Sequence, residues 1–539
     1  MTKSFNKTFS MLGALLKRDW LKLIIWILAV LAFAASGGGK FEALLHTAQQ
    51  RETMFTMFQN PAMISLFGPL SVHHGADFNA AVAFGQTMPL ITALVFAIVS
   101  VIYVINRTRK DEDDGVAELF RSFQIGKSAN TMAVIVELFL LQVIISLILA
   151  FSLQLGHVEG MTRFSDNLLF ASAIGGQSFM WGMFALVFAQ IFPDAGGAKG
   201  ATFGFLGLLY IIRMGTDVQA VNAGWFNPLS WTYLSDVYVK NDWLPIVLTL
   251  CLSVLLIILA FVLESNRDMN AGYLPEAQGR AHAPRSLRGI IGLTLRQQRT
   301  AIIGWLLGLL ILGFTYGSMF GQIGSFIGSN PTISQMFAID PKAGETAMVN
   351  QYMSTLFVIL SVIVTCFAIT SFSRMISEER KGRQEQLYAL PISRLKMYST
   401  YTIIAWVLGA IAQFAATLGI YLAQSGNKNA LSFMDVFKPG MVWVPAIFFV
   451  LGLLGLLIAF APRFIGVIWV YVGFAFFMSY IGNLIKFPAW VNNLDVFHHI
   501  PKLPTDAMNW TNFSIILGLA LIFVIVGFIG YRKRDLIGG

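Results

Sequence analysis

The stretch from residue 84 to residue 105, FGQTMPLITALVFAIVSVIYVI, decides the fold class of this chain. It contains no charged residue, and a helix that crosses a hydrocarbon core about 30 Å thick needs about 20 mostly apolar residues. The residues that follow at 107–127, RTRKDEDDGVAELFRSFQIGK, carry five positive and five negative charges. An uncharged apolar run that ends in a charged one predicts a membrane-spanning helix that emerges into water.

The rest of the chain alternates in the same way. Of its 539 residues, 56% are hydrophobic and 12% are charged, whereas an ordinary soluble domain has about 25% charged residues. A soluble protein could not cover this much apolar surface, so we expect the excess to face lipid. The predicted fold is an all-α polytopic membrane protein. Twelve spans are predicted, at residues 23–38, 84–105, 132–154, 169–191, 198–215, 246–263, 301–321, 352–373, 400–423, 441–461, 464–485 and 513–531.

The distribution of lysine and arginine predicts the orientation. With the N-terminus inside, 27 of the 37 basic residues fall in the inner segments, and basic residues are retained on the cytoplasmic side. Both termini are therefore predicted to be cytoplasmic. The net charge of +9 then reflects this bias and attraction to anionic lipid, and it gives no indication of nucleic-acid binding.

An internal repeat divides the chain. Residues Arg107–Lys127 align without a gap on Arg374–Arg394, and Arg267-Asp268 recurs as Arg534-Asp535, both at an offset of 267. Because each half holds an even number of spans, the repeat is predicted to be parallel. The predicted parts are a first six-helix half (1–272), a cytoplasmic linker (273–285) and a second six-helix half (286–539).

A further match places Leu12-Gly13 through Trp26 on Ile291-Gly292 through Trp305, at an offset of 279. The segments that carry it, roughly 5–22 and 285–300, mix apolar and basic residues at helical spacing. Such a pattern is typical of an amphipathic helix that lies in the inner interface, and we expect one before the first span of each half.

The two aligned inner loops hold the candidate functional residues. Each has charged residues, a glycine, a glutamate three residues later, an apolar stripe and a basic residue. A short helix of this kind below the membrane suits docking onto a soluble partner. A solvated connecting helix is the alternative, and the gap-free repetition favours docking. The residues predicted to couple to the partner are Gly115, Glu118, Leu119, Phe120, Gly382, Glu385, Leu387, Pro391 and Arg394.

At these loops the sequence resembles the permeases of type 2 ABC transporters. The double-length chain resembles the twelve-span form that exports polyketide antibiotics and other drugs. The second loop, with Gly382, Glu385 and Pro391-Ile392-Ser393-Arg394, matches the family pattern, whereas the first has Gln124-Ile125-Gly126-Lys127 in place of Pro-Ile-Ser-Arg.

The resemblance implies that these loops form coupling helices for two copies of a separate ABC ATPase. It further implies export of lipophilic or amphipathic compounds across the plasma membrane of a prokaryote. ATP and magnesium are expected on the partner chains, and no cofactor or metal is expected on this one.

The sequence gives no sign of an ATPase domain. Its only Gly-Lys-Ser, at residues 126–128, has Arg121 where a phosphate-binding loop needs its first glycine. We therefore expect a transport subunit and not an enzyme.

Ionisable residues inside spans are candidate sites, because each costs roughly 2.5–3.5 kcal/mol at the bilayer centre. Glu137 either makes a structural polar contact or takes part in a transport pathway, and its repeat mate is Ile404. Arg213 is expected to extend toward the outer interface. The pairs His73-His74 and His498-His499 lack a second ligand cluster, so no metal site is predicted.

Two alternatives from other classes remain. Twelve spans in a 6+6 arrangement also fit a secondary, ion-coupled multidrug transporter, which should carry paired charges or broken helices at mid-membrane in both halves. A membrane-embedded enzyme should gather His, Asp or Glu near one membrane face, and the sequence shows no such cluster.

Overall fold

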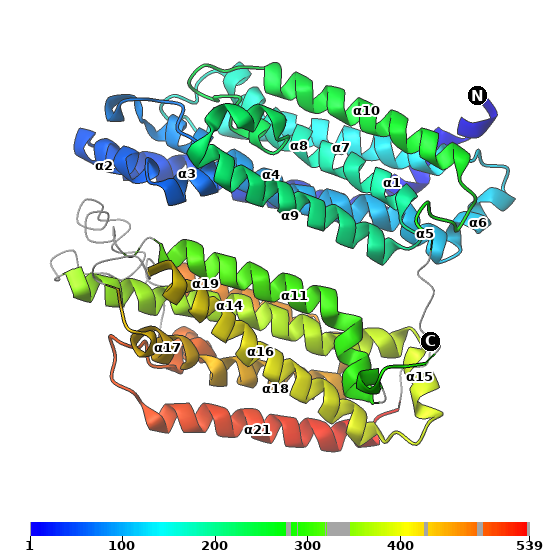
Figure 1. Ribbon diagram of the computed structural model, residues 1–539, viewed down its shortest axis with the longest axis vertical. Helices are drawn as coiled ribbons and strands as arrows, with labels where there is room; N and C mark the ends of the chain where they lie inside the picture. The colour runs from blue at the N-terminus through cyan, green and yellow to red at the C-terminus, as the bar shows by residue number, and fades with distance from the viewer. Residues whose placement is uncertain are drawn as a thin grey trace. The chain divides into compact units, whose positions relative to one another are not determined.

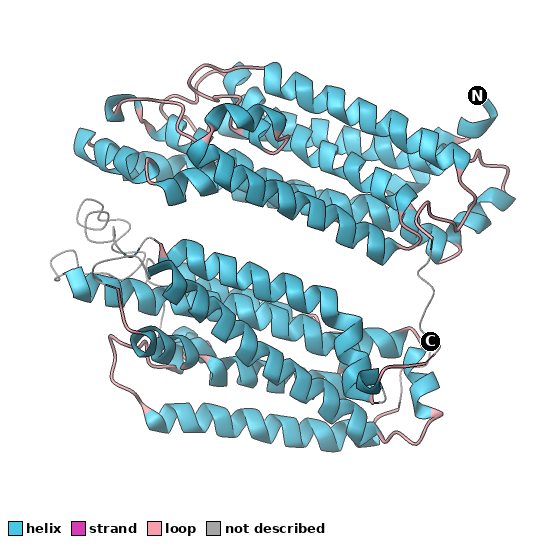
Figure 2. Cartoon of the chain, in the orientation of Figure 1, coloured by secondary structure: helices cyan, strands magenta, loops and turns pink. Residues whose placement is uncertain are grey.

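The computed structural model describes residues 2–275, 282–287, 289–318, 320, 345–424, 430–481 and 489–535. Within these ranges the regular elements are all helices, as Figure 2 shows. The chain divides into two compact units, Met1–Gly279 and Arg280–Gly539, which we call unit 1 and unit 2. The predicted all-α fold is confirmed.

Unit 1 is a bundle of long helices that run along a common direction (Figure 1). The N-terminus, α5 and α6 lie at one end of this bundle, and α2 and α3 lie at the other. The α-helices are α1 (Thr8–Leu44), α2 (Ala48–Phe58), α3 (Pro61–Phe67), α4 (Ala80–Arg107), α5 (Arg109–Asp113), α6 (Val116–Ser122), α7 (Ala129–Leu155), α8 (Phe164–Ile191), α9 (Ala195–Gln219) and α10 (Leu244–Asn266). Short 3-10 helices are η1 (Thr2–Phe5), η2 (Gly75–Asp77), η3 (Val221–Phe226) and η4 (Ser230–Thr232).

Unit 2 has the same kind of bundle, with α15 at the end where α21 finishes (Figure 1). Its α-helices are α11 (Ile290–Gly317), α14 (Glu345–Arg380), α15 (Arg383–Tyr388), α16 (Arg394–Gln424), α17 (Phe433–Met441), α18 (Val444–Phe460), α19 (Val467–Ile481), α20 (Ala489–Asn492) and α21 (Trp510–Lys533). Its 3-10 helices are η5 (Arg285–Leu287), η7 (Pro462–Phe464) and η8 (Val496–His499).

Ten helices in the described ranges are long and apolar enough to cross a membrane. They correspond to ten of the twelve predicted spans. The predicted span 23–38 falls in α1, and the side chains from residue 32 to residue 40 lie outside what the structure describes. The predicted span 464–485 corresponds to α19, a shorter apolar helix, and residues 482–488 lie outside the described ranges.

The interfacial helices differ from the prediction. Residues 8–44 form one continuous helix, α1, and residues 290–317 form another, α11. The expected separate helices at 5–22 and 285–300 are therefore largely the first turns of the spans that follow them. No proline or glycine interrupts either junction, at 20–23 or at 299–302, so nothing in the sequence ends the helix there.

Capping residues set several helix starts. The side chain of Asn79 accepts a hydrogen bond from the Val82 amide at the start of α4, and Asp194 accepts one from Gly197 at the start of α9. Each cap satisfies an amide that has no partner within the helix. Asp194 matters for the site below, because it fixes where α9 begins beside the first inner loop.

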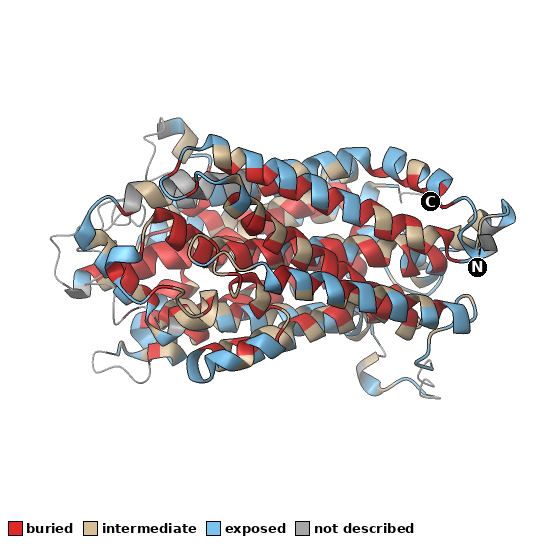
Figure 3. Cartoon of the chain, turned by 90° about the horizontal axis from the view of Figure 1, so that it is seen from above, coloured by how far each residue is buried: buried red, intermediate tan, exposed pale blue. Residues whose placement is uncertain are grey.

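Helix α8 is the centre of unit 1, since 83% of its most apolar window is buried. Figure 3 shows buried and exposed residues on different sides of the outer helices. Glycines allow the close approach of α7 and α8, because a Cβ atom at Gly182 would lie 2.5 Å from the Leu138 side chain. Small residues serve this purpose in membrane bundles, where lipid is as apolar as the core.

Candidate functional site: the inner-loop helices

A glycine in the left-handed conformation starts the short helix in each inner loop. Gly115 has φ +75° and precedes α6, and Gly382 has φ +68° and precedes α15. A Cβ atom at either position would meet no atom within 4 Å. Glycine is thus required by the backbone conformation and not by crowding. The glycine that precedes the glutamate by three residues in each loop therefore forms the same kind of turn in both units.

A buried ion pair anchors each loop to the last long helix of its unit. In unit 1 the Arg267 guanidinium binds both carboxylate oxygens of Glu112, at 2.8 and 2.6 Å. In unit 2 Arg534 binds both oxygens of Glu379, at 2.5 and 2.6 Å. The two pairs are equivalent at the offset of 267, and none of the four side chains is more than 12% exposed. Arg267 uses two nitrogens, which fixes orientation as well as distance, whereas Arg534 reaches both oxygens through one nitrogen.

A second equivalent contact closes the end of each loop. Lys127 donates to the backbone carbonyl of Arg267 at 3.2 Å, and its repeat mate Arg394 donates to the carbonyl of Arg534. The predicted basic residue at the end of the motif therefore holds the loop against the helix that carries the buried arginine.

Unit 1 has an additional anchor. Arg109 is 1% exposed and donates to the carbonyls of Pro193, Asn270 and Ala271. Asp113 accepts the Ala195 amide at 2.7 Å, which ties α5 to the start of α9.

In unit 2 the buried Ile376 stands at the place of Arg109. There Arg380, which is exposed, donates to the carbonyl of Pro462, the repeat mate of Pro193. The first loop is therefore held through more buried polar contacts than the second.

The predicted coupling residues lie on and beside these anchored turns. Glu118 is exposed and accepts a hydrogen bond from Asn270 at 3.2 Å, and Glu385 is also exposed. Leu119 is 59% exposed. Phe120, Leu387 and Arg394 are half-buried, and Pro391 is exposed.

The sequence analysis missed a matched pair of exposed apolar side chains. Phe123 is 61% exposed and Leu390 is 55% exposed, and they are equivalent at the offset of 267. Each follows its short helix, so each unit presents an exposed apolar side chain at the same place in its loop. The gap-free alignment contained this signal, which the search for charged and glycine positions overlooked.

The missed anchors, Glu112 with Arg267 and Glu379 with Arg534, had a weaker signal. The repeated Arg-Asp pair was visible in the sequence, but its partner lies 155 residues away in each unit. Only the folded chain brings the two ends together.

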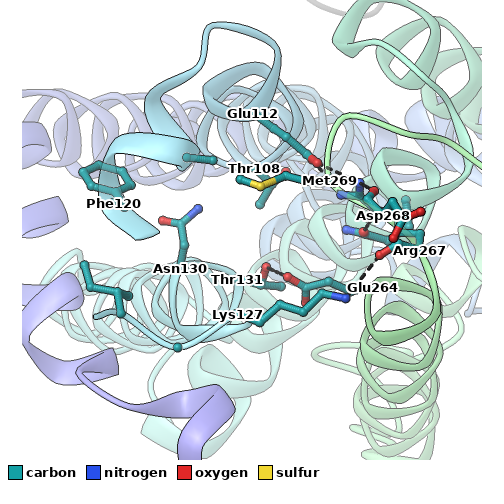
Figure 4. Close-up of a pocket in the computed structure, with 14 residues that line it drawn as sticks. Thr108, Glu112, Phe120, Lys127, Asn130, Thr131, Glu264, Arg267, Asp268 and Met269 are labelled. Atoms are coloured by element: carbon teal, nitrogen blue, oxygen red, sulfur yellow. Dashed lines mark hydrogen bonds and ion pairs between the residues drawn. The ribbon is translucent and has the colours of Figure 1, made fainter. Parts of the chain in front are cut away.

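A small polar cavity of about 60 Å³ lies behind α6 in unit 1 (Figure 4). Lys127, Asn130, Thr131 and Glu264 lie along one side of it, and Phe120 lies across from them. The Thr131 hydroxyl donates to Glu264 at 2.9 Å, while the second Glu264 oxygen has no protein partner. The cavity can accommodate water.

Glu137 belongs to a buried charged cluster in unit 1. It is 1% exposed and accepts a hydrogen bond from the Tyr103 hydroxyl at 2.5 Å. Asp19, also 1% exposed, binds Arg107 and lies 3.2 Å from Lys22. In unit 2 the positions of Asp19, Tyr103 and Glu137 hold neutral residues, which are Gln298, Thr370 and Ile404, whereas Arg107 is kept as Arg374. Gln298 accepts a hydrogen bond from Ser371 at 2.7 Å.

Known proteins resemble this chain both in unit 2 and along nearly its whole length. Residues 287–532 match the family described as the C-terminal domain of multidrug efflux system permease Rv1217c. The chain is similar to efflux permeases. Over 536 residues it is 26% identical to the multidrug efflux system permease protein Rv1217c of Mycobacterium tuberculosis, which covers 98% of this chain and 95% of that protein. The resemblance to an exporter permease, inferred from the inner loops, is confirmed.

The side chain of Arg213 departs from the expectation drawn from the sequence. Sequence analysis placed it at the outer interface, but its side chain is 0% exposed and pairs with Asp217 at 2.7 Å. It also donates to the carbonyls of Ser65 and Leu66, at the end of α3. The buried carboxylate of Asp217, one turn away, and the two carbonyls at the end of α3 give the guanidinium more partners than the interface would.

The histidine pairs remain outside any cluster. His73 and His74 are exposed, as is His498. Among the described residues no group of three His, Cys, Asp or Glu side chains could hold a metal ion.

Proposed function

We propose that this chain is the permease subunit of an ATP-driven exporter and that its two inner loops dock a separate ATPase. The observation that supports this most is the recurrence of one arrangement in both units. A left-handed glycine, a buried glutamate–arginine pair and an exposed apolar side chain occur at equivalent positions. The name of the relative from Mycobacterium tuberculosis agrees with an efflux role.

The anchors explain how movement of a docked ATPase reaches the membrane. A load on α5 is transmitted to α10 through the Glu112–Arg267 pair and to α9 through the Asp113–Ala195 hydrogen bond. A load on α15 reaches α21 through the contact between the Tyr388 and Tyr531 hydroxyls at 3.0 Å. The Glu379–Arg534 pair ties the end of α14, just before the turn, to the end of α21. Buried ion pairs resist such loads, because separating them leaves a charge without a partner.

The finer assignment follows from the family resemblance. Two ATPase copies bind ATP and magnesium, both termini of this chain are cytoplasmic, and the chain lies in the plasma membrane of a prokaryote. The exported compounds are lipophilic or amphipathic.

The test is association of the full-length permease with a separate ABC ATPase when the two are produced together. The complex should contain one permease chain and two ATPase chains, and the isolated permease should not hydrolyse ATP. Phe123→Asp combined with Leu390→Asp should weaken association at least tenfold, since two exposed apolar contacts become charged. Ser122→Asp, an exposed neighbour on α6, is the control for the added charge. ATP hydrolysis by the permease alone, or equal effects of both changes, would contradict the proposal.

Ion-coupled transport is the second candidate, and the buried cluster around Glu137 is the observation that favours it. A buried carboxylate with one oxygen that lacks a partner could exchange a proton. If the chain is an ion-coupled transporter, a proton gradient should drive transport without any ATPase. The substitution Glu137→Gln should then abolish that transport.

A further inference from the structure

A groove of about 700 Å³ lies between α1 and α4–α5 of unit 1. Helix α1 contributes Lys22, Ile25, Trp26 and Ala29, which lie on one helical face. The other wall consists of Val95, Phe96, Val99, Ile102, Tyr103, Asn106, Arg107, Lys110 and Asp111. We call this the α1–α4 groove. Its volume lies within the roughly 300–1,000 Å³ that is typical of sites for drug-sized ligands.

The polarity of the groove changes from one end to the other. Ala29 and Val95 lie at its apolar end, whereas Lys22, Arg107 and Lys110 lie at the end next to the inner loop. The helix rises about 18 Å over the twelve steps from Val95 to Arg107, which is close to the roughly 15 Å depth of one hydrocarbon leaflet. The groove thus has the polarity and length of one amphipathic molecule in the inner leaflet.

Aromatic side chains form the buried part of the apolar end. Trp26 is 7% exposed and Phe96 is 4% exposed, and their rings stack with centroids 6.4 Å apart. Tyr103 lies 6.3 Å from Trp26, measured between ring centroids. Ile25, Val99 and other exposed aliphatic side chains stand beside them, so an apolar body can lie against an extended surface.

The charged end is positive. Its lining holds three cations and one anion, Asp111, and Arg18 lies 3.3 Å from that carboxylate. Arg107 is bound to the buried Asp19. Lys22 is 73% exposed and Lys110 is 48% exposed, and their partners Asp19 and Asp114 lie at 3.2 and 3.6 Å. The Lys110–Asp114 pair is exposed on both sides, and such pairs are weak. The buried Asp19 keeps Arg107 as a partner when the exposed Lys22 turns away. Both ammonium groups can therefore turn to an anionic ligand.

Unit 2 keeps the mate of Arg107, Arg374, but lacks the two lysines. At the offset of 279 the mate of Lys22 is Ala301, and at the offset of 267 the mate of Lys110 is Ser377. Trp305 is kept opposite Trp26 in the repeat and stacks on Phe367. The aromatic feature is therefore common to the two units, and the two lysines belong to unit 1 alone.

We propose that the α1–α4 groove binds drug-sized amphipathic anions from the inner leaflet, with the anionic group on Lys22 and Lys110. The apolar body lies along Trp26, Phe96 and Val99. This assignment names the substrate class of the exporter and rests, in that respect, on the proposed function.

Binding is measured on the full-length permease in phosphatidylcholine nanodiscs, with empty nanodiscs subtracted. The probes are dodecyl phosphate and dodecanol, which share a chain and differ in charge. The main variant is Lys22→Ala with Lys110→Ser, which installs the residues that unit 2 carries. Lys396→Ala removes an exposed lysine in the first turn of α16 and serves as the control.

Dodecyl phosphate should bind the double variant about tenfold more weakly, since each basic side chain near a membrane surface contributes to anion attraction. Dodecanol binding should not change, and Lys396→Ala should alter neither probe by more than twofold. Val99→Trp, which fills the apolar end, should weaken both probes. Unchanged phosphate binding in the double variant would overturn the proposal, as would unchanged binding of both probes to Val99→Trp.

Failure of the proposed function has a different signature. If the permease binds the charged probe selectively but associates with no ATPase, the groove assignment stands and its role in ATP-driven export is refuted. If the permease forms a complex with the ATPase but binds both probes equally, the proposed function stands and the groove assignment is refuted.

Discussion

At the scale of single residues, buried charges determine which parts of the chain are held together. Arg213 and Arg267 both end long apolar segments, and the sequence alone suggests that such residues reach for water. Each instead finds a carboxylate within its own unit, Asp217 for the first and Glu112 for the second. A guanidinium makes several directed hydrogen bonds at once, so burial is favoured wherever the fold supplies the acceptors.

Removing one member of the anchor pair should destabilise unit 1. Arg267→Met leaves Glu112 buried with an incomplete set of partners, and we expect a loss of about 3 kcal/mol in the free energy of unfolding. Glu112→Gln combined with Arg267→Met should lose less, because no charge is then buried alone. Thermal unfolding in detergent measures both, with Arg534→Met as the matched change in unit 2. A double variant that loses the sum of the two single effects would show that the residues do not interact.

Asp495 should make the stability of unit 2 depend on pH. It is 4% exposed, and burial raises its pKa from 3.8 to about 6, although His499 and Lys502 act in the opposite direction. The folded state therefore favours the neutral acid. This stabilisation is fully present below pH 3.8, and it is lost as the pH rises to about 6.

The substitution Asp495→Asn should remove that dependence. Asparagine keeps an oxygen that can accept the Phe497 amide, which Asp495 binds at 3.0 Å. At pH 7 the variant should be more stable than the native chain by about 2–3 kcal/mol, and at pH 4 the two should be nearly equal. Melting temperatures across pH 4–7 measure this, and a constant difference at every pH would refute it.

At the scale of elements, the turn between α5 and α6 and the turn between α14 and α15 set the direction of the short helices. Both depend on a glycine with positive φ that no neighbour crowds. The short helices α6 and α15 have 7 and 6 residues, too few to be stable alone. Their position therefore depends on these turns and on the anchors before and after them.

Alanine at either turn should loosen the short helix that follows. A left-handed conformation costs an L-residue roughly 1–2 kcal/mol, and we expect Gly115→Ala and Gly382→Ala to have similar effects. Hydrogen exchange of the amides at 116–122 and 383–388 should become about fivefold faster or more. Gly200→Ala in α9, where a Cβ atom also meets nothing within 4 Å, should instead stabilise its helix. Slower exchange in the turn variants would contradict the assignment.

At the scale of the whole molecule, the two units share one arrangement and differ in charge. The first inner loop carries five positive and five negative charges, and the second carries five positive and three negative. Unit 1 alone holds the Asp19–Arg107–Glu137 cluster and the lysines of the α1–α4 groove. The duplication has thus kept the anchors and changed the surfaces, so two identical ATPase chains would meet different loops.

Charge reversal at equivalent positions should reveal this difference. Asp114 and Lys381 are related by the offset of 267 and both are exposed, whereas Asp113 is bound to Ala195 and unsuitable for the test. Asp114→Lys and Lys381→Asp should change the ATPase activity of the complex unequally. Each reversal should change the interaction free energy with the ATPase by less than about 1 kcal/mol, because the charges are exposed. The difference between the two variants should become smaller at high salt. Equal effects at every salt concentration would show that both side chains are merely solvated.

The sequence by itself determined the fold class, ten spans and the repeat positions of the inner loops. It could do so because apolar runs of about 20 residues have few solutions other than a spanning helix, and because glycine tolerates a turn that other residues resist. The coupling roles of Glu118, Glu385 and their neighbours were also read from the sequence, and they stay predictions.

Only the tertiary structure decided how those loops are held. The partners Glu112 and Arg267, Glu379 and Arg534, and Arg213 and the end of α3 lie far apart in the chain. The structure also joined the expected interfacial helices to their spans and brought α1 beside α4 to form the groove. Local patterns repeat every few residues and can be read in place, whereas a buried charge takes its partner from whatever the packing of distant helices brings within reach.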